Sequence, residues 1–363
     1  MNKTKVLFIL NDLGGGGAEK VFVHIANGFE SKGLATEMLL AENRGVYFDI
    51  VSPTIPLHIL GAKSFLDILR KLPTFLKGKN YTHVFTAFDY ISAATIITNK
   101  RLKQKLVTIA TLHYNLPYQL SILPRVNRVW LKYLNKYIIA NADKLVCVSN
   151  GVGEGFKQVV GIKDLLIKTI YNPVVESSLY KQANEDIEDN YKRIEYLITI
   201  GRLNKQKNQK NLLQAFQLVL QKNPNLHLLI LGAGPKEFEL KDICNGLAIR
   251  ENVHFLGFQP NPFKYLARAK LFVLSSDYEG LGNVIIEALA LGINVVSTDC
   301  PSGPREILNN EKYGWLSEMK NPDDLAAKIN WALEHPKPPS FLKERSKFFE
   351  KDLIVKEYLN ILK

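Results

Sequence analysis

Short apolar runs alternate with loops and amphipathic stretches along most of the chain. The runs KVLFIL, HVFTA, EYLITI and LFVLSS each have the length and composition of a buried strand. Apolar residues also recur 3, 4, 7, 8 and 11 positions after Ala18, which is the spacing of one helix face. Because strands and helices alternate in this way, the pattern predicts parallel sheets that helices cover on both faces.

The alternation is interrupted once, at residues 176–195, where the sequence is polar, acidic and without a period. We interpret this segment as a linker between two α/β domains, residues 1–175 and residues 196–340. A final segment, residues 341–363, follows the proline-rich HPKPPS and is predicted to be helical. Two α/β domains in tandem favour a ligand site in a cleft between them.

Four consecutive glycines, Gly14 to Gly17, separate the first predicted strand from the first predicted helix. Glycine lets the backbone approach a ligand closely, and the start of a helix offers free N–H groups to an anion. The spacing matches neither the dinucleotide-binding G-x-G-x-x-G pattern nor a P-loop. The loop is therefore either a phosphate-binding turn or an ordinary tight turn.

A second loop concentrates positive charge. The stretch TIGRLNKQKNQKN holds four cations and no carboxylate, after a predicted strand and before a predicted helix. A helix start already carries partial positive charge, so this clustering favours a negative ligand. We expect Lys205 and Lys210 to be solvated. Arg202 follows the strand-ending Gly201, and we expect Arg202 and Lys207 to bind an anion such as a diphosphate.

Two glutamates stand out in a third stretch, which runs from LFVLSS into an apolar helix predicted to begin near Asn283. Glu279 is expected to be exposed at the carboxyl end of the strand. Glu287 is the lone charge in the apolar helix, where a buried carboxylate is costly unless it is hydrogen-bonded. Glu287 therefore either binds a ligand or is stabilised by the helix dipole or an internal partner.

These motifs together resemble family 4 of the retaining, nucleotide-sugar-dependent glycosyltransferases. The resemblance rests on the E-x₇-E pair Glu279 and Glu287, on GRLNKQKN upstream and on the N-terminal GGAE, and its motifs span residues 14–306. It implies the GT-B fold, in which two Rossmann-like domains face each other across a cleft. It also implies that the C-terminal helix, here residues 341–363, crosses back to the first domain.

The resemblance also implies roles for single residues. Arg202 and Lys207 would hold the donor's diphosphate, Glu279 would contact hydroxyls of the donor sugar, and Glu287 would contact the ribose. His113 would face the donor sugar, although a core histidine is an equal alternative. The remaining donor-side positions are Gly16 and Gly17 beside the diphosphate or acceptor, Gly257 and Phe258 at the base, and Gly280, Leu281, Gly282 and Asn283 as a phosphate cradle.

The resemblance further implies a reaction and its requirements. The donor would be a nucleotide diphosphate sugar, with uridine as the expected base and a hexose or N-acetylhexosamine as the sugar. The leaving phosphate would take the acceptor's proton, so that the anomeric configuration is retained. The sequence has no D-x-D at a strand end, so we expect cations to replace a metal, and we expect no cofactor.

The net charge of +12 lies almost entirely in the first half of the chain. Residues 1–175 hold 22 lysines and arginines against 11 aspartates and glutamates, whereas residues 176–363 hold 25 against 24. The first half should therefore face an anionic partner, namely nucleic acid, an anionic membrane surface or an acidic substrate. No nucleic-acid-binding module is recognisable, so we expect no nucleic-acid partner.

Two basic amphipathic segments favour the membrane. One carries a stripe of cations flanked by aromatic residues: Arg125, Arg128, Lys132 and Lys136, with Trp130, Tyr133 and Tyr137. The other is KSFLDILRKLPTFLKGK. Such segments can lie on an anionic membrane surface, although ordinary helices with solvated basic faces are the alternative. We expect a lipid-linked saccharide acceptor in cell-surface glycan assembly, such as a capsule, O-antigen, lipopolysaccharide or protein-glycan precursor.

Other features limit the compartment and the class of protein. No run of about 18 apolar residues occurs, so no membrane-spanning helix is predicted. The cysteines Cys147, Cys244 and Cys300 are far apart in apolar surroundings, which is typical of core residues in a reducing compartment. The expected location is the cytoplasm, at the inner face of the cell membrane. The alternatives are a nucleic-acid-binding protein and a GT-B-like scaffold without catalysis, because motifs for an epimerase or a phosphorylase are absent from the sequence.

Overall fold

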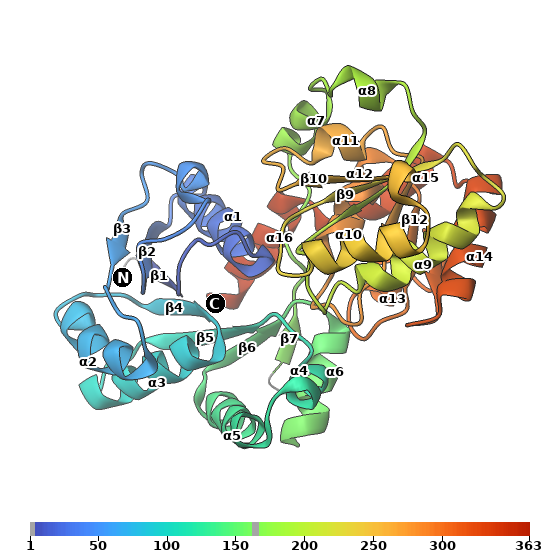
Figure 1. Cartoon of the computed structure of the whole chain (residues 1–363). Helices are drawn as coiled ribbons and strands as arrows, with labels where there is room; N and C mark the ends of the chain where they lie inside the picture. The colour runs from blue at the N-terminus through green and yellow to red at the C-terminus, as the bar shows by residue number, and fades with distance from the viewer. Residues whose placement is uncertain (1–3, 162–166) are drawn as a thin grey trace. The chain divides into compact units, whose positions relative to one another are not determined.

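The chain forms two compact units. The computed structural model describes residues 4–161 and 167–363. Unit 1 consists of residues 1–173 and 351–363, and unit 2 of residues 174–350 (Figure 1). Within the described residues, no helix combines the length and hydropathy that a membrane crossing requires.

Unit 1 is a parallel sheet with helices on both faces. Its strands are β1 (Lys5–Leu10), β2 (Ala35–Leu40), β3 (Leu57–Ile59), β4 (His83–Ala87), β5 (Val107–Leu112), β6 (Lys144–Cys147) and β7 (Ile167–Thr169). Its helices are α1 (Gly17–Ser31), η1 (Phe48–Ile50), α2 (Phe65–Leu76), α3 (Asp89–Leu102), α4 (Leu116–Ile122), α5 (Arg125–Asn141), α6 (Asn150–Val160) and α16 (Lys351–Ile361). The strand order is β3-β2-β1-β4-β5-β6-β7, so the order of connection reverses between β1 and β4.

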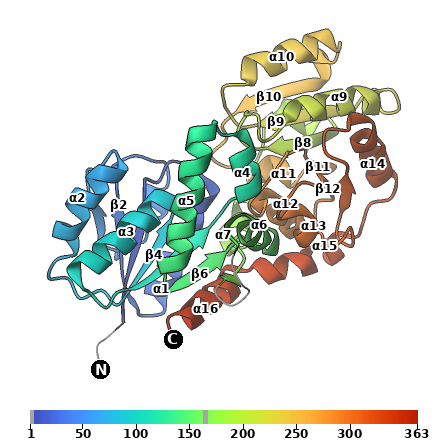
Figure 2. The ribbon, with the colours of Figure 1, turned by 90° about the horizontal axis from the view of Figure 1, so that it is seen from below.

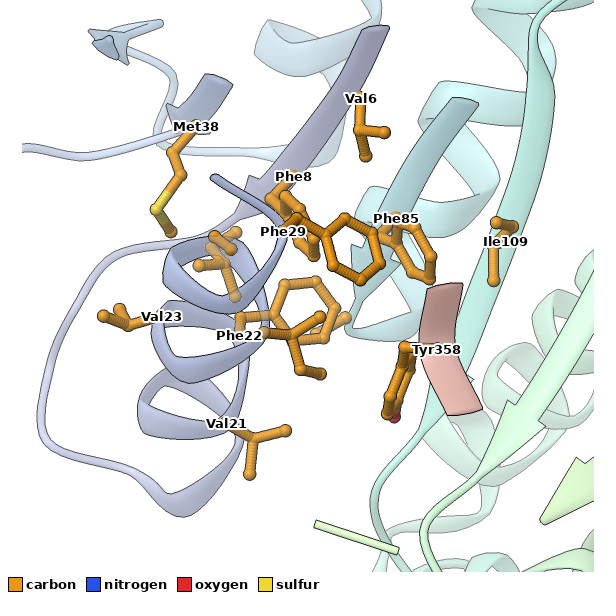
Figure 3. Close-up of a cluster of buried hydrophobic side chains, with 14 of the residues drawn as sticks. Val6, Phe8, Val21, Phe22, Val23, Phe29, Met38, Phe85, Ile109 and Tyr358 are labelled. Carbon is orange, nitrogen blue, oxygen red and sulfur yellow. The ribbon is translucent and has the colours of Figure 1, made fainter. Parts of the chain in front are cut away.

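Alternate residues of the strands of unit 1 build two cores. On one face, Phe8 of β1 stacks on Phe85 of β4 with ring centroids 5.0 Å apart, and Phe22 and Phe29 of α1 pack edge-on against Phe8 (Figure 3). On the other face, Leu7 and Ile9 pack with buried residues of α2 and α3. Successive strand residues are therefore buried on opposite sides, as the continuous apolar run of β1 predicts.

Helix α16 completes the first of these cores. Ile354, Val355, Tyr358 and Ile361 are buried among residues of β1, α1 and β4 (Figure 3). The methyl groups of Val355 lie where a side chain on Gly28 of α1 would be, so that glycine allows the two helices to approach closely. The Lys144 ammonium donates to the Ile361 carbonyl. The expected return of the C-terminal helix to the first domain is confirmed, because these contacts lie within unit 1.

The bounds of that returning segment differ from the prediction. Residues 341–346 belong to α15 (Pro339–Ser346) of unit 2, followed by η3 (Lys347–Phe349), and the chain passes to unit 1 only after Glu350. The reason is local packing, since Leu342, Ser346 and Phe349 are buried within unit 2. Only residues 351–363 join unit 1.

Three helices of unit 1 form a layer on one face of its sheet. Helix α3 lies between α2 and α5 and contacts both, and Figure 2 shows the three side by side. Almost every residue of α3 from Ile91 to Thr98 is buried, whereas α2 and α5 each keep an exposed face. The two basic segments of the sequence are therefore the two flanking helices of one layer.

Unit 2 repeats this architecture. Its strands are β8 (Tyr196–Ile200), β9 (His227–Leu231), β10 (Val253–Gly257), β11 (Leu271–Leu274), β12 (Val295–Thr298) and β13 (Trp315–Ser317). Its helices, besides α15 and η3, are α7 (Ser177–Ala183), α8 (Asp189–Lys192), α9 (Gln209–Leu220), α10 (Glu237–Gly246), η2 (Arg250–Asn252), α11 (Phe263–Leu266), α12 (Asn283–Leu291), α13 (Pro304–Ile307) and α14 (Pro322–Glu334). The sheet order is β10-β9-β8-β11-β12-β13, and the described strand pairs are parallel in both sheets.

The segment 176–195 is part of unit 2 rather than a separate linker. It contains α7 and α8, and Leu179, Ala183 and Ile187 are buried. One of its exposed carboxylates is tied to the domain, since the Tyr265 hydroxyl donates to the Glu188 carboxylate at 2.8 and 2.9 Å. Most of its polar residues are exposed, so the polar composition reflects a solvated surface of unit 2 whose few apolar residues are buried.

Candidate functional site

The candidate site lies at the carboxyl edge of the sheet of unit 2. Strand β8 pairs with β9 on one side and with β11 on the other, so the chain reverses its direction of winding between β8 and β11. In open α/β sheets, ligands bind beyond the carboxyl ends of the strands at this switch point. The loop after β8 carries Arg202 and Lys207, and the loop after β11 carries Glu279.

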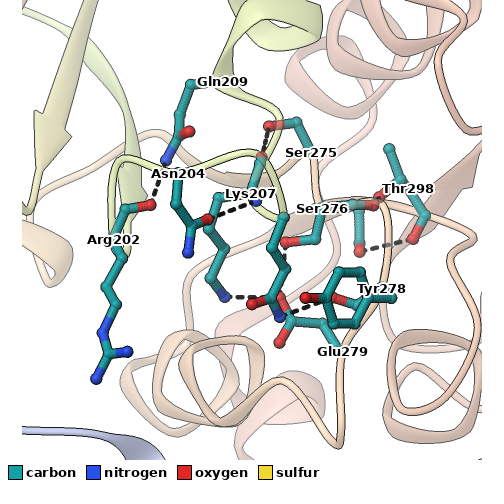
Figure 4. Close-up of polar contacts among 11 residues, drawn as sticks. Arg202, Asn204, Lys207, Gln209, Ser275, Ser276, Tyr278, Glu279 and Thr298 are labelled. Atoms are coloured by element: carbon teal, nitrogen blue, oxygen red, sulfur yellow. Dashed lines mark hydrogen bonds and ion pairs between the residues drawn. The ribbon is translucent and has the colours of Figure 1, made fainter. Parts of the chain in front are cut away.

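A buried ion pair joins these two loops. The Lys207 ammonium lies 2.6 Å from Oε1 of Glu279, and the two side chains are 17% and 8% exposed (Figure 4). The Ser276 hydroxyl donates to the same carboxylate oxygen at 2.6 Å. The prediction that Glu279 is exposed was wrong, because the loop after β11 turns its carboxylate inward, toward Lys207.

Amide and hydroxyl side chains fix the shape of the loop after β8. The Lys207 N–H donates to Oδ1 of Asn204 at 3.1 Å, and the Ser275 hydroxyl donates to the Lys207 carbonyl at 2.9 Å. Asn208 adopts a left-handed conformation, with φ of 43°, and its amide donates to Oδ1 of Asp277 at 2.8 Å. The position of the Lys207 ammonium is therefore set by both loops.

These bracing residues were not identified from the sequence. The signal that could have found them is the group of polar residues, Ser275, Ser276 and Asp277, directly after the buried strand β11. All three are themselves buried. Buried polar side chains need hydrogen-bond partners. Here the Lys207 carbonyl, the Glu279 carboxylate and the Asn208 amide supply them.

Arg202 differs from Lys207 in its surroundings. Its backbone carbonyl accepts a hydrogen bond from the Gln209 amide at 3.0 Å, whereas its side chain is exposed. Figure 4 shows the guanidinium pointing away from the Lys207–Glu279 pair. No hydrogen bond or ion pair to this guanidinium comes from the described parts of the chain. Lys205 and Lys210 are exposed, as predicted.

The start of α12 lies beside the ion pair in sequence and is held by close backbone contact. Gly282 has φ of 93° and precedes the first residue of the helix, Asn283. A Cβ on Gly303 would overlap the Leu281 carbonyl, and Gly303 also has a positive φ of 98°. Arg345 of α15 donates to the carbonyls of Glu306 and Ile307 at 2.8 Å each. Helix α13, which begins after Gly303, is thereby fixed at both ends.

Glu287 lies one turn into α12. The apolar residues on both sides of it in sequence, Ile286 and Ala288, are buried, but Glu287 itself is only partly buried. An apolar neighbourhood in sequence did not mean full burial at this position.

Gly257 and Phe258 lie at the same edge of the sheet, two strands from β8. Gly257 ends β10 with φ of 66°, and its carbonyl accepts from the Gly232 N–H at 2.7 Å. Phe258 follows with an exposed ring. The structure thus places both residues at the carboxyl edge that carries Arg202 and Glu279.

In unit 1, an ion pair missed in the sequence holds the glycine loop. Asp12 is buried, and its carboxylate accepts from the Gly14 N–H at 2.8 Å and from the Arg44 guanidinium at 2.5 and 3.2 Å. Gly15 has φ of 88°, and Gly16 precedes the first residue of α1, Gly17. The glycines therefore serve a specific turn into a helix start.

His113 directly follows β5 in unit 1. Its Nε2 lies 2.8 Å from the Thr111 hydroxyl, and its ring lies 5.9 Å from that of Phe22. Burial lowers the pKa of His113 to about 4, so that the imidazole is neutral at pH 7. It can donate or accept a hydrogen bond, but it carries no charge.

The chain is similar to known glycosyltransferases along both units. A family model described as "Glycosyl transferases group 1" matches residues 181–349, and one described as "Glycosyltransferase Family 4" matches residues 15–177. An uncharacterized glycosyltransferase of Methanocaldococcus jannaschii is 44% identical over 39% of this chain and 36% of its own length. A Campylobacter jejuni N-acetylgalactosamine-N,N'-diacetylbacillosaminyl-diphospho-undecaprenol 4-alpha-N-acetylgalactosaminyltransferase is 32% identical over 64% of this chain and 63% of its own length. The matched regions thus span less than two thirds of each of these two relatives.

Among solved structures, Anabaena Alr3699/HepE in complex with UDP has a TM-score of 0.82 at 20% identity, with 99% of each chain covered. This likeness supports the GT-B fold, in agreement with the two parallel Rossmann-like sheets. One family model ends at residue 177 and the next begins at residue 181, so the two match nearly the whole chain in succession. The chain belongs to the family 4 glycosyltransferases.

Proposed function

We propose that this protein transfers a hexose or N-acetylhexosamine from a uridine diphosphate sugar to a saccharide acceptor, with retention of the anomeric configuration. The observation that carries the proposal is the Lys207–Glu279 pair at the switch point of unit 2, with Arg202 on the same loop. A cationic group fixed at this edge, next to a helix start, suits a diphosphate.

The choice of donor is supported by structural relatives. The Anabaena protein was crystallised with UDP and with UDP-glucose. In our proposal, the exposed Phe258 and Gly257 lie against the base, and Glu287 accepts hydrogen bonds from the ribose. The backbone of Gly280, Leu281, Gly282 and Asn283 contributes N–H groups toward the phosphates. From unit 1, Gly16 and Gly17 would contact the diphosphate or the acceptor, and the neutral His113 the donor sugar.

The two cations have different tasks in this proposal. Glu279 partly neutralises Lys207 and fixes its position, so Lys207 is preorganised but brings little net charge. Arg202 has no such carboxylate partner among the described residues, and its planar guanidinium suits bidentate contact with phosphate. As the bond from the anomeric carbon to the diphosphate oxygen breaks, negative charge collects on the diphosphate, and preorganised cations stabilise that charge. The acceptor oxygen attacks from the same side, and its proton passes to the leaving diphosphate.

The acceptor in this proposal is a lipid-linked or other cell-surface saccharide. The Campylobacter relative is named for a substrate linked to diphospho-undecaprenol, and a Rhizobium meliloti relative for lipopolysaccharide core biosynthesis. Such an acceptor would be reached from the cytoplasmic side, at an anionic membrane surface.

Replacing Arg202 with alanine tests the proposed diphosphate site. We expect Arg202→Ala to lower kcat/KM for the UDP-sugar by roughly 10²–10³-fold, the usual effect of losing one preorganised group that stabilises transition-state charge. The melting temperature should not change, because the side chain is exposed. Transfer of a radiolabelled sugar from a panel of UDP-sugars to an extracted lipid acceptor measures the rate.

Lys210→Ala is the matched control, since Lys210 is also an exposed cation near the start of α9. It should keep a near-normal rate. Equal losses in the two variants, or none in either, would contradict the role given to Arg202. Lys207→Ala is less informative, because it also leaves the buried Glu279 without its cation and so mixes stability with catalysis.

Replacing Gly303 with alanine tests the start of α12. The added Cβ would overlap the Leu281 carbonyl at a residue with positive φ, so the loop from Gly280 to Asn283 must move. We expect the affinity for UDP to fall at least about tenfold in isothermal titration. Gly246→Ala, at the end of α10 where a Cβ meets no atom within 4 Å, is the control and should bind UDP normally. Normal UDP binding by Gly303→Ala would show that this loop does not contact the nucleotide.

Retention can be read from the product. With an α-linked UDP-sugar as donor, we expect an α-linked product, because the acceptor and the leaving group occupy the same face of the sugar. The one-bond and vicinal coupling constants of the anomeric proton in the NMR spectrum distinguish the two anomers. A β-linked product would contradict the front-face mechanism.

We also propose that transfer needs no metal, because Arg202 and the N–H groups at the start of α12 supply positive charge near the diphosphate, while Lys207, neutralised by Glu279, contributes a preorganised hydrogen-bond donor. The initial rate should therefore be unchanged after dialysis against EDTA. Recovery of lost activity on adding back Mg²⁺ or Mn²⁺ would refute this part of the proposal, while leaving the assignment as a transferase intact.

A further inference from the structure

Helix α5 presents an apolar and basic face to solvent. We define the α5 outer face by seven of the exposed residues of the helix: Arg125, Val126, Val129, Trp130, Lys132, Tyr133 and Lys136. Val126 is 80% exposed, Val129 55%, Trp130 53% and Tyr133 66%. Four large apolar side chains this exposed on one helix form a contiguous patch, which indicates an interaction site.

The helical period orders these residues into stripes. Val126, Val129 and Tyr133 are spaced by three and four positions, so they form one line along the helix. They lie opposite the buried residues Leu131 and Ile138, which pack into unit 1. Arg125, Lys132 and Lys136 lie along one side of this apolar line, and Trp130 along the other.

The fourth cation of the predicted stripe has a different task. The Arg128 guanidinium donates to the carbonyls of Ser121 and Leu123, at 3.3 and 3.2 Å. It therefore fixes the corner between the end of α4 and the start of α5. On the other side of α5, Asn135 is fully buried and its amide donates to the Tyr114 hydroxyl, outside the helix, at 3.3 Å. The α5 outer face is consequently carried by a helix that is anchored to its unit.

The apolar, aromatic and basic side chains of the α5 outer face together indicate which kind of partner it binds. Aliphatic side chains, Trp and Tyr gain free energy in the headgroup region of a bilayer, and Lys and Arg beside them attract anionic lipids. A second protein would instead be expected to meet an apolar patch with few charges at its centre. The excess of 22 cationic over 11 acidic residues in residues 1–175 adds long-range attraction to an anionic surface.

Helix α2 extends this surface. It belongs to the same layer as α5, with α3 between them (Figure 2). Leu66 is among the most exposed apolar residues of the described chain, and Lys63 beside the helix is exposed as well. The layer thus offers apolar and basic groups from two helices.

We propose that the α5 outer face docks unit 1 on an anionic lipid surface. Val126, Val129, Trp130 and Tyr133 enter the headgroup region, while Arg125, Lys132 and Lys136 contact the lipid phosphates. The inference rests on the proposed function only for its biological purpose, which is to bring the enzyme to a lipid-linked acceptor. The docking itself requires no donor and no turnover.

The experiment is co-sedimentation of the full chain with vesicles of phosphatidylcholine, with and without phosphatidylglycerol, at low and high salt. We expect binding to the phosphatidylglycerol vesicles that weakens with salt. Each cation near such a surface contributes about 1 kcal/mol, or roughly fivefold. The triple variant Arg125→Gln, Lys132→Gln, Lys136→Gln should therefore bind roughly 100-fold more weakly at low salt.

Matched variants in unit 2 serve as controls. Trp130→Ser should weaken vesicle binding and abolish the blue shift of tryptophan fluorescence on adding vesicles, whereas Trp331→Ser, at an equally exposed tryptophan, should not. Replacing the exposed Lys222, Lys312 and Lys347 with glutamine removes the same charge elsewhere and should leave most of the binding intact. Unchanged vesicle binding by the triple variant or by Trp130→Ser would overturn the proposal.

Other outcomes are equally decisive. If the face joined two copies of this chain, the wild type would dimerise in light scattering, and Val126→Ser would make it monomeric without affecting vesicle binding. If it bound RNA, the triple variant would lose RNA binding and keep vesicle binding. Either result overturns the lipid assignment. Transfer to a water-soluble acceptor analogue is measured separately, and the α5 variants should leave it unchanged, so loss of docking and loss of transferase function are distinguishable.

Discussion

Parallel pairing is the constraint on which the rest of this structure depends. In the described strands of both sheets, the chain must leave each strand at the same edge and return by a helix to the other. All loops that follow strands therefore gather at one edge. In unit 2 that edge collects Arg202 and Lys207 after β8, Gly257 after β10 and Glu279 after β11, from positions up to 77 residues apart. Because the direction of winding reverses between β8 and β11, these two strands are neighbours in the sheet. The polar loops that follow them therefore lie side by side.

The charges of these loops then determine which side chains at the carboxyl edge of unit 2 remain available to a ligand. Four cations in one loop would repel one another, yet among the described residues only Lys207 has a carboxylate partner, the buried Glu279. A buried pair costs desolvation and adds little net stability, but it fixes the position of its charges. The same division appears in unit 1, where the buried Asp12 binds both Arg44 and the backbone of the glycine loop. In each unit, a largely buried carboxylate shapes a loop that suits an anion.

Much of the fold could be predicted from the sequence, because long apolar runs and helical periods report burial directly. The strands β1, β4 and β8 and the helices α1 and α12 lie where the pattern placed them. The strands β3, β7 and β13 have only three residues each, too few for a period. The polar segment 176–195 was misassigned because only a few apolar residues, Leu179, Ala183 and Ile187, attach it to unit 2, while most of its polar residues face water.

The candidate site was predictable in composition but not in geometry. The spacing of the motifs identified Arg202, Lys207, Glu279 and Glu287 as candidate site residues. It did not indicate which of the two glutamates is buried. That depends on where the loop after β11 points its side chains, which is decided by contacts with Lys207 and Ser276. Asp12 and Arg44 are 32 positions apart, and neither belongs to a motif, so only the fold reveals their pairing.

The return of α16 has a consequence for how the protein is made. Phe8, Phe22 and Phe85 emerge early from the ribosome, but their core also needs Tyr358 and Ile354, which are synthesised after all of unit 2. Until then, aromatic side chains of the first unit lack part of their cover, and exposed apolar surface favours association with chaperones or with other nascent chains. Unit 2 is continuous in sequence and can complete its own core first. The core of unit 1 can therefore be completed only after unit 2 has been synthesised, although most of unit 1 is translated first.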